Sequence, residues 1–83
     1  MSKYIAKITV NTDEKTLMYI DIDITDMQYY IYKNAYNLFN IDCEQDMQYY
    51  MSIHHDIQKQ CAEKTTLQDI YVIDIAKSLN DFE

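Results

Sequence analysis

Two histidines and two cysteines are the residues of this chain best suited to bind a metal ion or to act as nucleophiles. His54 and Cys61 share one face of an expected helix, but seven positions separate them, about 10 Å along the axis. Cys43 lies about 27 Å from Cys61 on the same scale. Zinc ligands lie about 2.0–2.3 Å from the ion, and no Cys-x-x-Cys or His-x-x-x-His spacing is present. We therefore expect no metal, no cofactor and no Cys–His nucleophile pair, and interpret His54 as a histidine at the edge of the core and His55 as a surface residue.

Carboxylates are numerous but show no convergent acid–base pair, so we expect a protein that is not an enzyme. Asp21 and Asp23 share the outer face of an expected strand, about 6.7 Å apart. Such residues form either an ordinary solvated face or a series of charges that imitates a nucleic-acid backbone and occupies the Lys/Arg groove of a nucleic-acid-binding protein. The remaining members of this acidic set are Asp13, Glu14, Asp42, Glu44 and Asp46.

Tyrosine is unusually frequent, with nine residues in the chain against two Phe and no Trp. One interpretation is that Tyr serves as the bulky core residue. The other is a partly exposed tyrosine patch among carboxylates, because Tyr is enriched at interface hot spots. The candidate partner-binding tyrosines are Tyr29, Tyr32, Tyr36 and Tyr49.

The composition excludes several function classes. The 83 residues carry a net charge of −7, and all seven basic residues are Lys. Direct nucleic-acid binding and binding to an anionic membrane are disfavoured, because both depend on an excess of basic residues. The chain contains no Gly, so it cannot build the glycine-rich loops of P-loop and dinucleotide-binding enzymes.

Length and hydropathy indicate a single small domain over residues 1–83. No stretch approaches the ~20 apolar residues of a membrane span, and the N-terminus leads directly into a strand-like pattern. We expect a soluble cytoplasmic protein, in the host cytoplasm if it is phage-encoded. In that compartment Cys43 and Cys61 would be reduced, and we interpret both as small core residues.

The element order follows from hydrophobic periodicity. Residues 3–10 and 16–24 alternate with period two and predict a hairpin joined by the polar pentad 11–15. Matching the apolar faces predicts the register, with Ile8 opposite Met18 and Ala6 opposite Ile20. Lys3 then opposes Asp23 on the outer face.

A helical period then replaces the strand period. Thr25 and Gln28 form a predicted capping box for a helix that continues to about Phe39. Two apolar stripes are expected on this helix, the first being Met27, Ile31, Ala35 and Leu38, and the second Tyr29, Tyr32, Tyr36 and Phe39. Asp42, with Gln45 three residues later, is the expected cap of a second helix over 43 to about 62. Its apolar stripe is predicted to hold Met47, Tyr50, His54, Ile57 and Cys61.

β-branched residues at 70–75 predict a third strand, followed by a short helical or frayed tail; a helix from residue 67 is the alternative. The predicted fold is therefore α+β, with a small antiparallel sheet and two helices packed on one face in the order ββααβ.

A five-residue repeat marks the start of both helices. Residues 26–30 and 46–50 share the sequence Asp-Met-Gln-Tyr-Tyr. On the expected faces, the Met and the second Tyr of each copy point to the core and the first Tyr points away from it.

By composition alone, the chain is similar to the small acidic proteins that phages and mobile elements encode to block host proteins, including DNA mimics and anti-CRISPR proteins. The first hypothesis is therefore a non-enzymatic inhibitor that docks on a basic, nucleic-acid-binding host protein. The alternative is a structural or regulatory subunit that forms a homodimer through its tyrosine-rich helix face.

Overall fold

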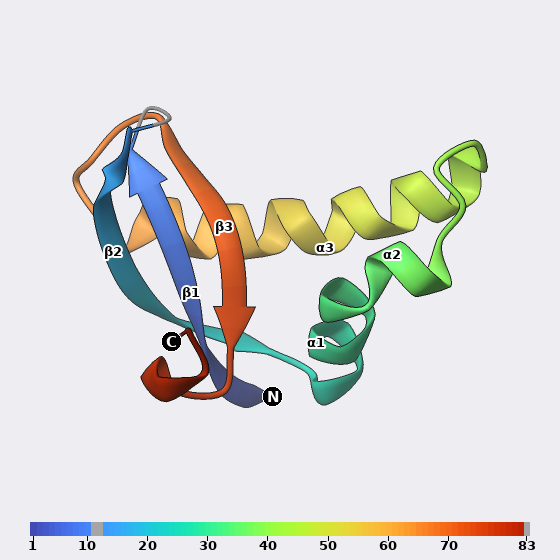
Figure 1. The fold of residues 1–83 in the computed structure, drawn as a ribbon, viewed down its shortest axis with the longest axis horizontal. Coiled ribbons are helices and arrows are strands. Elements are labelled where there is room, and N and C mark those ends of the chain that lie inside the picture. Colours follow the sequence, from blue (N-terminus) through green and yellow to red (C-terminus); the bar gives the residue numbers. More distant parts are fainter. Residues whose placement is uncertain (11–12, 83) are drawn as a thin grey trace.

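The computed structural model describes residues 1–10 and 13–82 of the chain. This part of the chain forms a three-stranded antiparallel sheet with helices packed on one face, so the predicted α+β fold and its ββααβ order are confirmed (Figure 1). In chain order the elements are β1 (Ser2–Val10), β2 (Asp13–Ile24), α1 (Asp26–Lys33), α2 (Ala35–Leu38), α3 (Glu44–Glu63), β3 (Ile70–Ala76) and the short 3-10 helix η1 (Leu79–Phe82).

The register of the β1–β2 hairpin is the one that face matching predicts. Ile8 opposes Met18, Ala6 opposes Ile20, and Lys3 opposes Asp23. A slip of one residue would expose the apolar face, so burial of that face determines the pairing. β2 begins at Asp13, earlier than the expected start at 16; positions 11 and 12 of the predicted turn lie outside the described residues.

The predicted third strand is present, and it pairs with β1, giving the sheet order β2-β1-β3. Ala6 opposes Ile75 and Ile8 opposes Val72, so the apolar residues of β3 continue the buried face. The register shifts between Lys7 and Ile8, which leaves Ile73 as the extra residue of a bulge.

The core lies between this face of the sheet and α3. Ile8, Ile22 and Ile24 are fully buried from the strand side. Burying a side chain of this size contributes about 1.5–3 kcal/mol, so a few isoleucines supply much of the stability of so short a chain. Tyr29, Ile31 and Tyr32 of α1 pack against the same cluster. The buried residues of α3 are Ile53, Ile57 and Cys61.

The predicted apolar stripe of α3 was partly wrong. Ile57 and Cys61 are buried as expected, but Ile53, which the stripe omitted, is buried too, whereas Tyr50 and His54 are only half-buried. The reason is that only the C-terminal part of α3 lies over the sheet, so the stripe that contacts the sheet differs from the average stripe of the whole helix (Figure 1).

The single helix expected from Thr25 to Phe39 is interrupted at Asn34. The capping box at its start is confirmed, because Thr25 and Gln28 exchange side-chain and backbone hydrogen bonds. Asn34 donates from its side chain to the carbonyl of Tyr30 over 2.8 Å. Side chains of this type compete with helical hydrogen bonding, and α2 starts again at Ala35 in a new direction (Figure 1).

The predicted cap of the second helix was also wrong. Cys43 occupies the N-cap position of α3, and its side chain makes no capping hydrogen bond. Asp42 instead donates its backbone N–H to Oδ1 of Asn40 over 2.9 Å. Asp46 Oδ2 accepts the backbone N–H of Asn40 over 3.0 Å, so a first-turn carboxylate organises the connection to α2.

Side chains of α3 and of its C-cap residue, Lys64, protect the outer edge of β2. Gln60 donates from Nε2 to the carbonyl of Asp23 and accepts the Asp23 N–H at Oε1, both over 2.8 Å. Lys64 donates to the carbonyl of Asp21. Across the sheet, Gln58 donates to the carbonyl of Ile70 over 2.5 Å. These bonds occupy backbone groups that an edge strand would otherwise offer to another chain.

The predicted helical tail is the 3-10 helix η1. Its Phe82 lies on the outer face of the sheet, 5.4 Å from the ring of Tyr19. Lys7 Nζ lies 5.9 Å from the Phe82 ring centroid, a cation–π distance. The tail therefore covers part of the sheet face opposite the core.

Candidate functional site

The N-terminal half of α3 extends beyond the sheet, and α2 lies beside it (Figure 1). We call residues 34–51 the distal lobe: Asn34, α2, the connection to α3 and the first two turns of α3. Within the described residues, no position of this lobe is fully buried. The lobe therefore adds little to the core, which leaves its surface available for another role.

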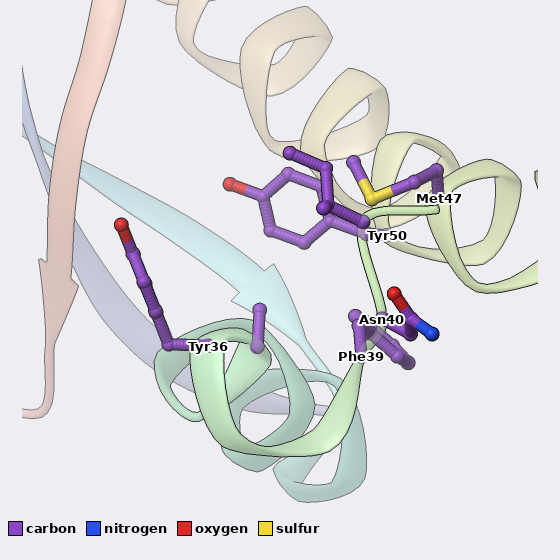
Figure 2. Close-up of a pocket in the computed structure, with 7 residues that line it drawn as sticks. Tyr36, Phe39, Asn40, Met47 and Tyr50 are labelled. Atoms are coloured by element: carbon purple, nitrogen blue, oxygen red, sulfur yellow. The ribbon is translucent and has the colours of Figure 1, made fainter. Parts of the chain in front are cut away.

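A groove lies between α2 and α3 in the distal lobe. It has a volume of about 720 Å³ and is open to solvent. Figure 2 shows Tyr36 rising from α2 on one side, Met47 and Tyr50 on the α3 side, and Phe39 and Asn40 on the segment between them. The lining residues are Ala35, Tyr36, Phe39, Asn40, Ile41, Met47 and Tyr50.

Aromatic contacts join the connection after α2 to the α3 wall of the groove. The Phe39 ring lies edge-on to Tyr49 and Tyr50, with centroids 6.0 Å and 6.3 Å apart. Edge-to-face pairs of this kind are worth about 0.5–1.5 kcal/mol beyond the area they bury. Phe39, the residue that follows α2, therefore packs the connection between the helices against α3.

Large apolar side chains stand exposed around the groove. Tyr36 is fully exposed, Ile41 is 79% exposed and Tyr49 is 51% exposed. Exposed apolar residues that gather around a groove are typical of an interaction site, whereas isolated ones are ordinary. Ile41 was not among the predicted binding residues; its signal in the sequence is an isoleucine between Asn40 and Asp42 in a short polar connection.

The same lobe is acidic throughout. Asp42, Glu44 and Asp46 lie in it, and the sequence holds no Lys or Arg between Lys33 and Lys59. Asp42 and Glu44 are exposed, while Asp46 is half-buried because it accepts the Asn40 N–H. Carboxylates without nearby cations produce a negative potential at the groove.

Two of the four candidate tyrosines are built into the packed structure. Tyr29 stacks on the buried Tyr4, with ring centroids 4.3 Å apart, and Lys77 Nζ lies over the Tyr29 ring, 5.9 Å from its centroid. Tyr32 stacks on Tyr50 at 5.3 Å. Only Tyr36 and Tyr49 of the predicted set are exposed on the distal lobe, so the structure does not gather all four in one patch.

Asp21 and Asp23, the other candidate binding residues, lie on β2 near the C-terminal end of α3. Gln60, which binds the Asp23 backbone, is sixteen positions from Glu44, or about 24 Å along the helix. The structure therefore separates the two aspartates from the acidic lobe. The side chains of Asp13 and Glu14 lie outside the described residues.

The two copies of the repeat have different surroundings. In the second copy Tyr49 is exposed, as predicted, but Met47 and Tyr50 line the open groove and are only half-buried, so they do not point to the core. In the first copy the prediction was wrong, because Met27 and Tyr30 are 66% and 56% exposed while Tyr29 packs on the core. The first copy starts directly after its N-cap, but the second starts two positions further into its helix, so identical residues meet different neighbours.

His54 belongs to an aromatic stack that includes Tyr32 and Tyr50. Its Nδ1 lies 2.9 Å from the Tyr32 hydroxyl, and its ring centroid lies 6.0 Å and 6.2 Å from those of Tyr32 and Tyr50. Burial lowers the pKa of His54, and the neighbouring His55 lowers it further. Burial raises the pKa of Tyr32, with Tyr50 as the next cause. Both groups are therefore neutral at pH 7, and His54 serves as a packed polar residue.

The cysteines are free, and their surroundings differ. Cys61 is buried beneath the sheet, and this burial raises the pKa of its thiol to about 11, with the nearby Lys64 opposing the shift. A thiol of that pKa is almost entirely protonated at neutral pH and is a poor nucleophile. Among residues 1–10 and 13–82, no three His, Cys, Asp or Glu side chains come together as metal ligands would.

No helix of the described residues has the length and hydropathy to span a bilayer. Comparison with protein-family models, curated proteins and solved structures gave no match. The distinctive surface features of the described residues are thus the groove of the distal lobe and the carboxylates around it.

Proposed function

We propose that this chain is a non-enzymatic, acidic protein-binding protein whose distal lobe docks on the basic surface of a nucleic-acid-binding protein. The single observation that carries this proposal is the open apolar groove, set in a segment with carboxylates and no basic residue. Apolar contacts would supply affinity, and the negative rim would steer the lobe toward a surface built to bind phosphates.

Charge also favours a different protein over a second copy of this chain. In a symmetric dimer formed through the distal lobes, the surface that carries Asp42, Glu44 and Asp46 would lie against the same acidic surface of the second copy. Like charges brought together at an interface cost free energy. Self-association through the tyrosine-bearing face remains the alternative, and the Tyr36 and Ile41 side chains are the exposed groups that it would use.

A small protein that covers a nucleic-acid-binding surface acts as a competitive inhibitor. Within this proposal, the biological class is a phage or mobile-element inhibitor of the anti-CRISPR or DNA-mimic type, acting in the host cytoplasm. The test of this class is interference with a host nuclease: the purified protein should reduce the nuclease's affinity for DNA in proportion to the protein's occupancy.

The first experiment captures partners of the tagged protein from the lysate of a bacterium that carries defence systems, at about 0.01 M and about 0.15 M salt. The electrostatic screening lengths at these salt concentrations differ about fourfold. A complex held by charge attraction is therefore retained far better at the lower salt concentration. The proposal expects a basic, nucleic-acid-binding protein that is lost at the higher salt.

Matched charge variants locate the surface. Asp42→Asn with Glu44→Gln removes two exposed charges from the distal lobe, and Asp21→Asn with Glu63→Gln removes two exposed charges elsewhere. Binding of the captured partner should weaken about tenfold in the first variant and change little in the second. The reverse result would place the site near β2 and the C-terminal end of α3. A doubled mass in light scattering, with no other partner, would favour the homodimer.

A further inference from the structure

We infer that the occupant of the distal groove is an amphipathic helix of the partner, with apolar anchors flanked by Lys or Arg. This inference rests on the proposed function and adds the form of the ligand. It follows from the volume of the groove, from the elements that build it and from the charge at its rim.

The volume favours several anchors over one. Pockets of about 300–1,000 Å³ take a whole drug-sized molecule, and the groove, at about 720 Å³, falls well within this range. A single inserted side chain would leave most of it wet. Successive anchors at positions i, i+3 or i+4, and i+7 of a helix lie on one face and can fill such a groove together.

The walls suit a helix better than a strand. A peptide that binds as a strand adds to a free sheet edge, whereas this groove lies between two helices. The outer edge of β2 is occupied by Gln60 and Lys64, and Gln58 binds the first carbonyl of β3. Met47 adds an unbranched, adaptable side chain of the kind found in grooves that receive helices.

The rim determines the charge of the occupant. Asp42 and Glu44 are exposed beside the groove, and Ile41, which lines it, lies between Asn40 and Asp42 in the chain. A helix bound in this groove would bring the residues that flank its apolar anchors close to these carboxylates. The distal lobe contains no Lys or Arg that would compete for them. Lys or Arg at those positions gains from the negative potential, whereas Asp or Glu would be repelled.

Fluorescence anisotropy with synthetic peptides tests this inference. The probe is a labelled peptide of about four helical turns, with leucines at i, i+3, i+4 and i+7 and lysines elsewhere. One control peptide has the same composition with the leucines spread around the helix. A second keeps the leucines in place and replaces the lysines with glutamines. The native protein should bind the probe at least about tenfold more tightly than either control.

Protein variants connect binding to the groove. Ile41→Gln and Tyr36→Ala change exposed groove residues, so the fold should be retained and affinity for the probe should fall about tenfold. Leu79→Gln and Tyr30→Ala change exposed residues outside the groove and should leave the affinity unchanged. Circular dichroism of each variant checks that it folds.

The outcomes separate this inference from the proposed function. If both lysine peptides bind equally, and only Asp42→Asn with Glu44→Gln weakens them, charge-guided docking stands and the helical occupant is overturned. If the glutamine peptide binds as tightly as the probe, the groove accepts a helix but the basic partner is overturned. If the uncharged dye Nile red binds the groove and the probe does not displace it, the occupant is a small apolar molecule. If Ile41→Gln converts a dimer to a monomer, the occupant is a second copy.

Discussion

At the scale of single residues, tyrosine contacts position two polar side chains, His54 and Asp26. His54 lies against Tyr32 and Tyr50 and accepts or donates one hydrogen bond through Nδ1. The Tyr4 hydroxyl donates a hydrogen bond to the Asp26 carboxylate, and this bond lowers the pKa of Asp26 and raises the pKa of Tyr4. Polar side chains near the core are thus used to join α1 to its neighbours, which suits a structural role.

Stability should fall in mild acid because of His54. Its pKa in the folded chain lies below the ordinary value of 6.5, so the unfolded chain takes up the proton first as the pH falls. The contribution of the neutral ring is complete above about pH 6.5 and is lost as the pH falls from there through the folded pKa. Urea unfolding at about pH 7.5 and about pH 5.5 should show a smaller difference in His54→Gln than in the native protein. His55→Gln, at an exposed neighbour, should keep most of the native difference; an unchanged difference in His54→Gln would contradict the assignment.

Truncation of Ile57 should be strongly destabilising. Ile57 is fully buried on α3, and replacing such a side chain with Ala costs about 2–5 kcal/mol through lost burial and the cavity left behind. Ile41→Ala removes the same atoms from a largely exposed position and should change the free energy of unfolding by less than about 0.5 kcal/mol. Chemical denaturation of both variants gives their free energies of unfolding. Similar losses of stability in the two variants would contradict the assignment of Ile57 to the core.

At the scale of elements, α3 has two roles along its length. Its C-terminal part covers the sheet with Ile53, Ile57 and Cys61 and binds the edge of β2 through Gln60. Its N-terminal part contacts the connection from α2 and forms one wall of the groove. Because a continuous helix is stiff, packing at one end fixes the direction in which the distal lobe projects.

Gln60→Glu should weaken the edge of β2. A carboxylate can still accept a hydrogen bond from the Asp23 N–H but cannot donate one to the Asp23 carbonyl. Its second oxygen would instead face the carbonyl oxygen of Asp23, and the two would repel each other. The lost bond and the unsatisfied group should cost about 1–3 kcal/mol. Gln68→Glu adds the same charge at an exposed position and serves as the control in thermal unfolding. Equal melting temperatures in the two variants would show that Gln60 does not protect the strand.

At the scale of the whole molecule, stability and interaction are separated in space. The buried residues gather between the sheet and the C-terminal part of α3. None of the described residues of the distal lobe is buried. Regions with few buried contacts open at lower free energy than the core does. The lobe can therefore adjust to a partner without disturbing the sheet.

Thiol labelling should reveal this separation. Cys43 lies half-buried at the start of α3, whereas Cys61 is fully buried and its thiol pKa is raised to about 11. In native protein near pH 8, an aromatic disulfide reagent should modify Cys43 rapidly and Cys61 only at the rate of global unfolding. Cys43→Ser and Cys61→Ser variants assign the two phases. Rapid modification of both thiols would contradict the separation.

The sequence by itself determined the local structure. Alternation of apolar residues around Ile8 and Ile20 specified the hairpin register, and Thr25 with Gln28 specified the start of α1. β-branched residues at 70–75 specified β3. The hairpin register, the start of α1 and the position of β3 each depend on residues close in the chain or on a single apolar face. Such features are visible in the hydrophobic periodicity of the sequence. The negative charge of the segment between Lys33 and Lys59 is likewise a property of sequence alone.

Only the tertiary structure decided how these surfaces meet. It placed β3 beside β1, packed Tyr29 and Tyr32 inward, and left Tyr36 and Tyr49 exposed on the lobe. The two repeat copies have the same side chains but opposite exposure, because exposure depends on which other element covers a helix face. The groove exists for the same reason: α3 is longer than the sheet that it covers, and α2 turns at Asn34 to lie beside the part that extends beyond it.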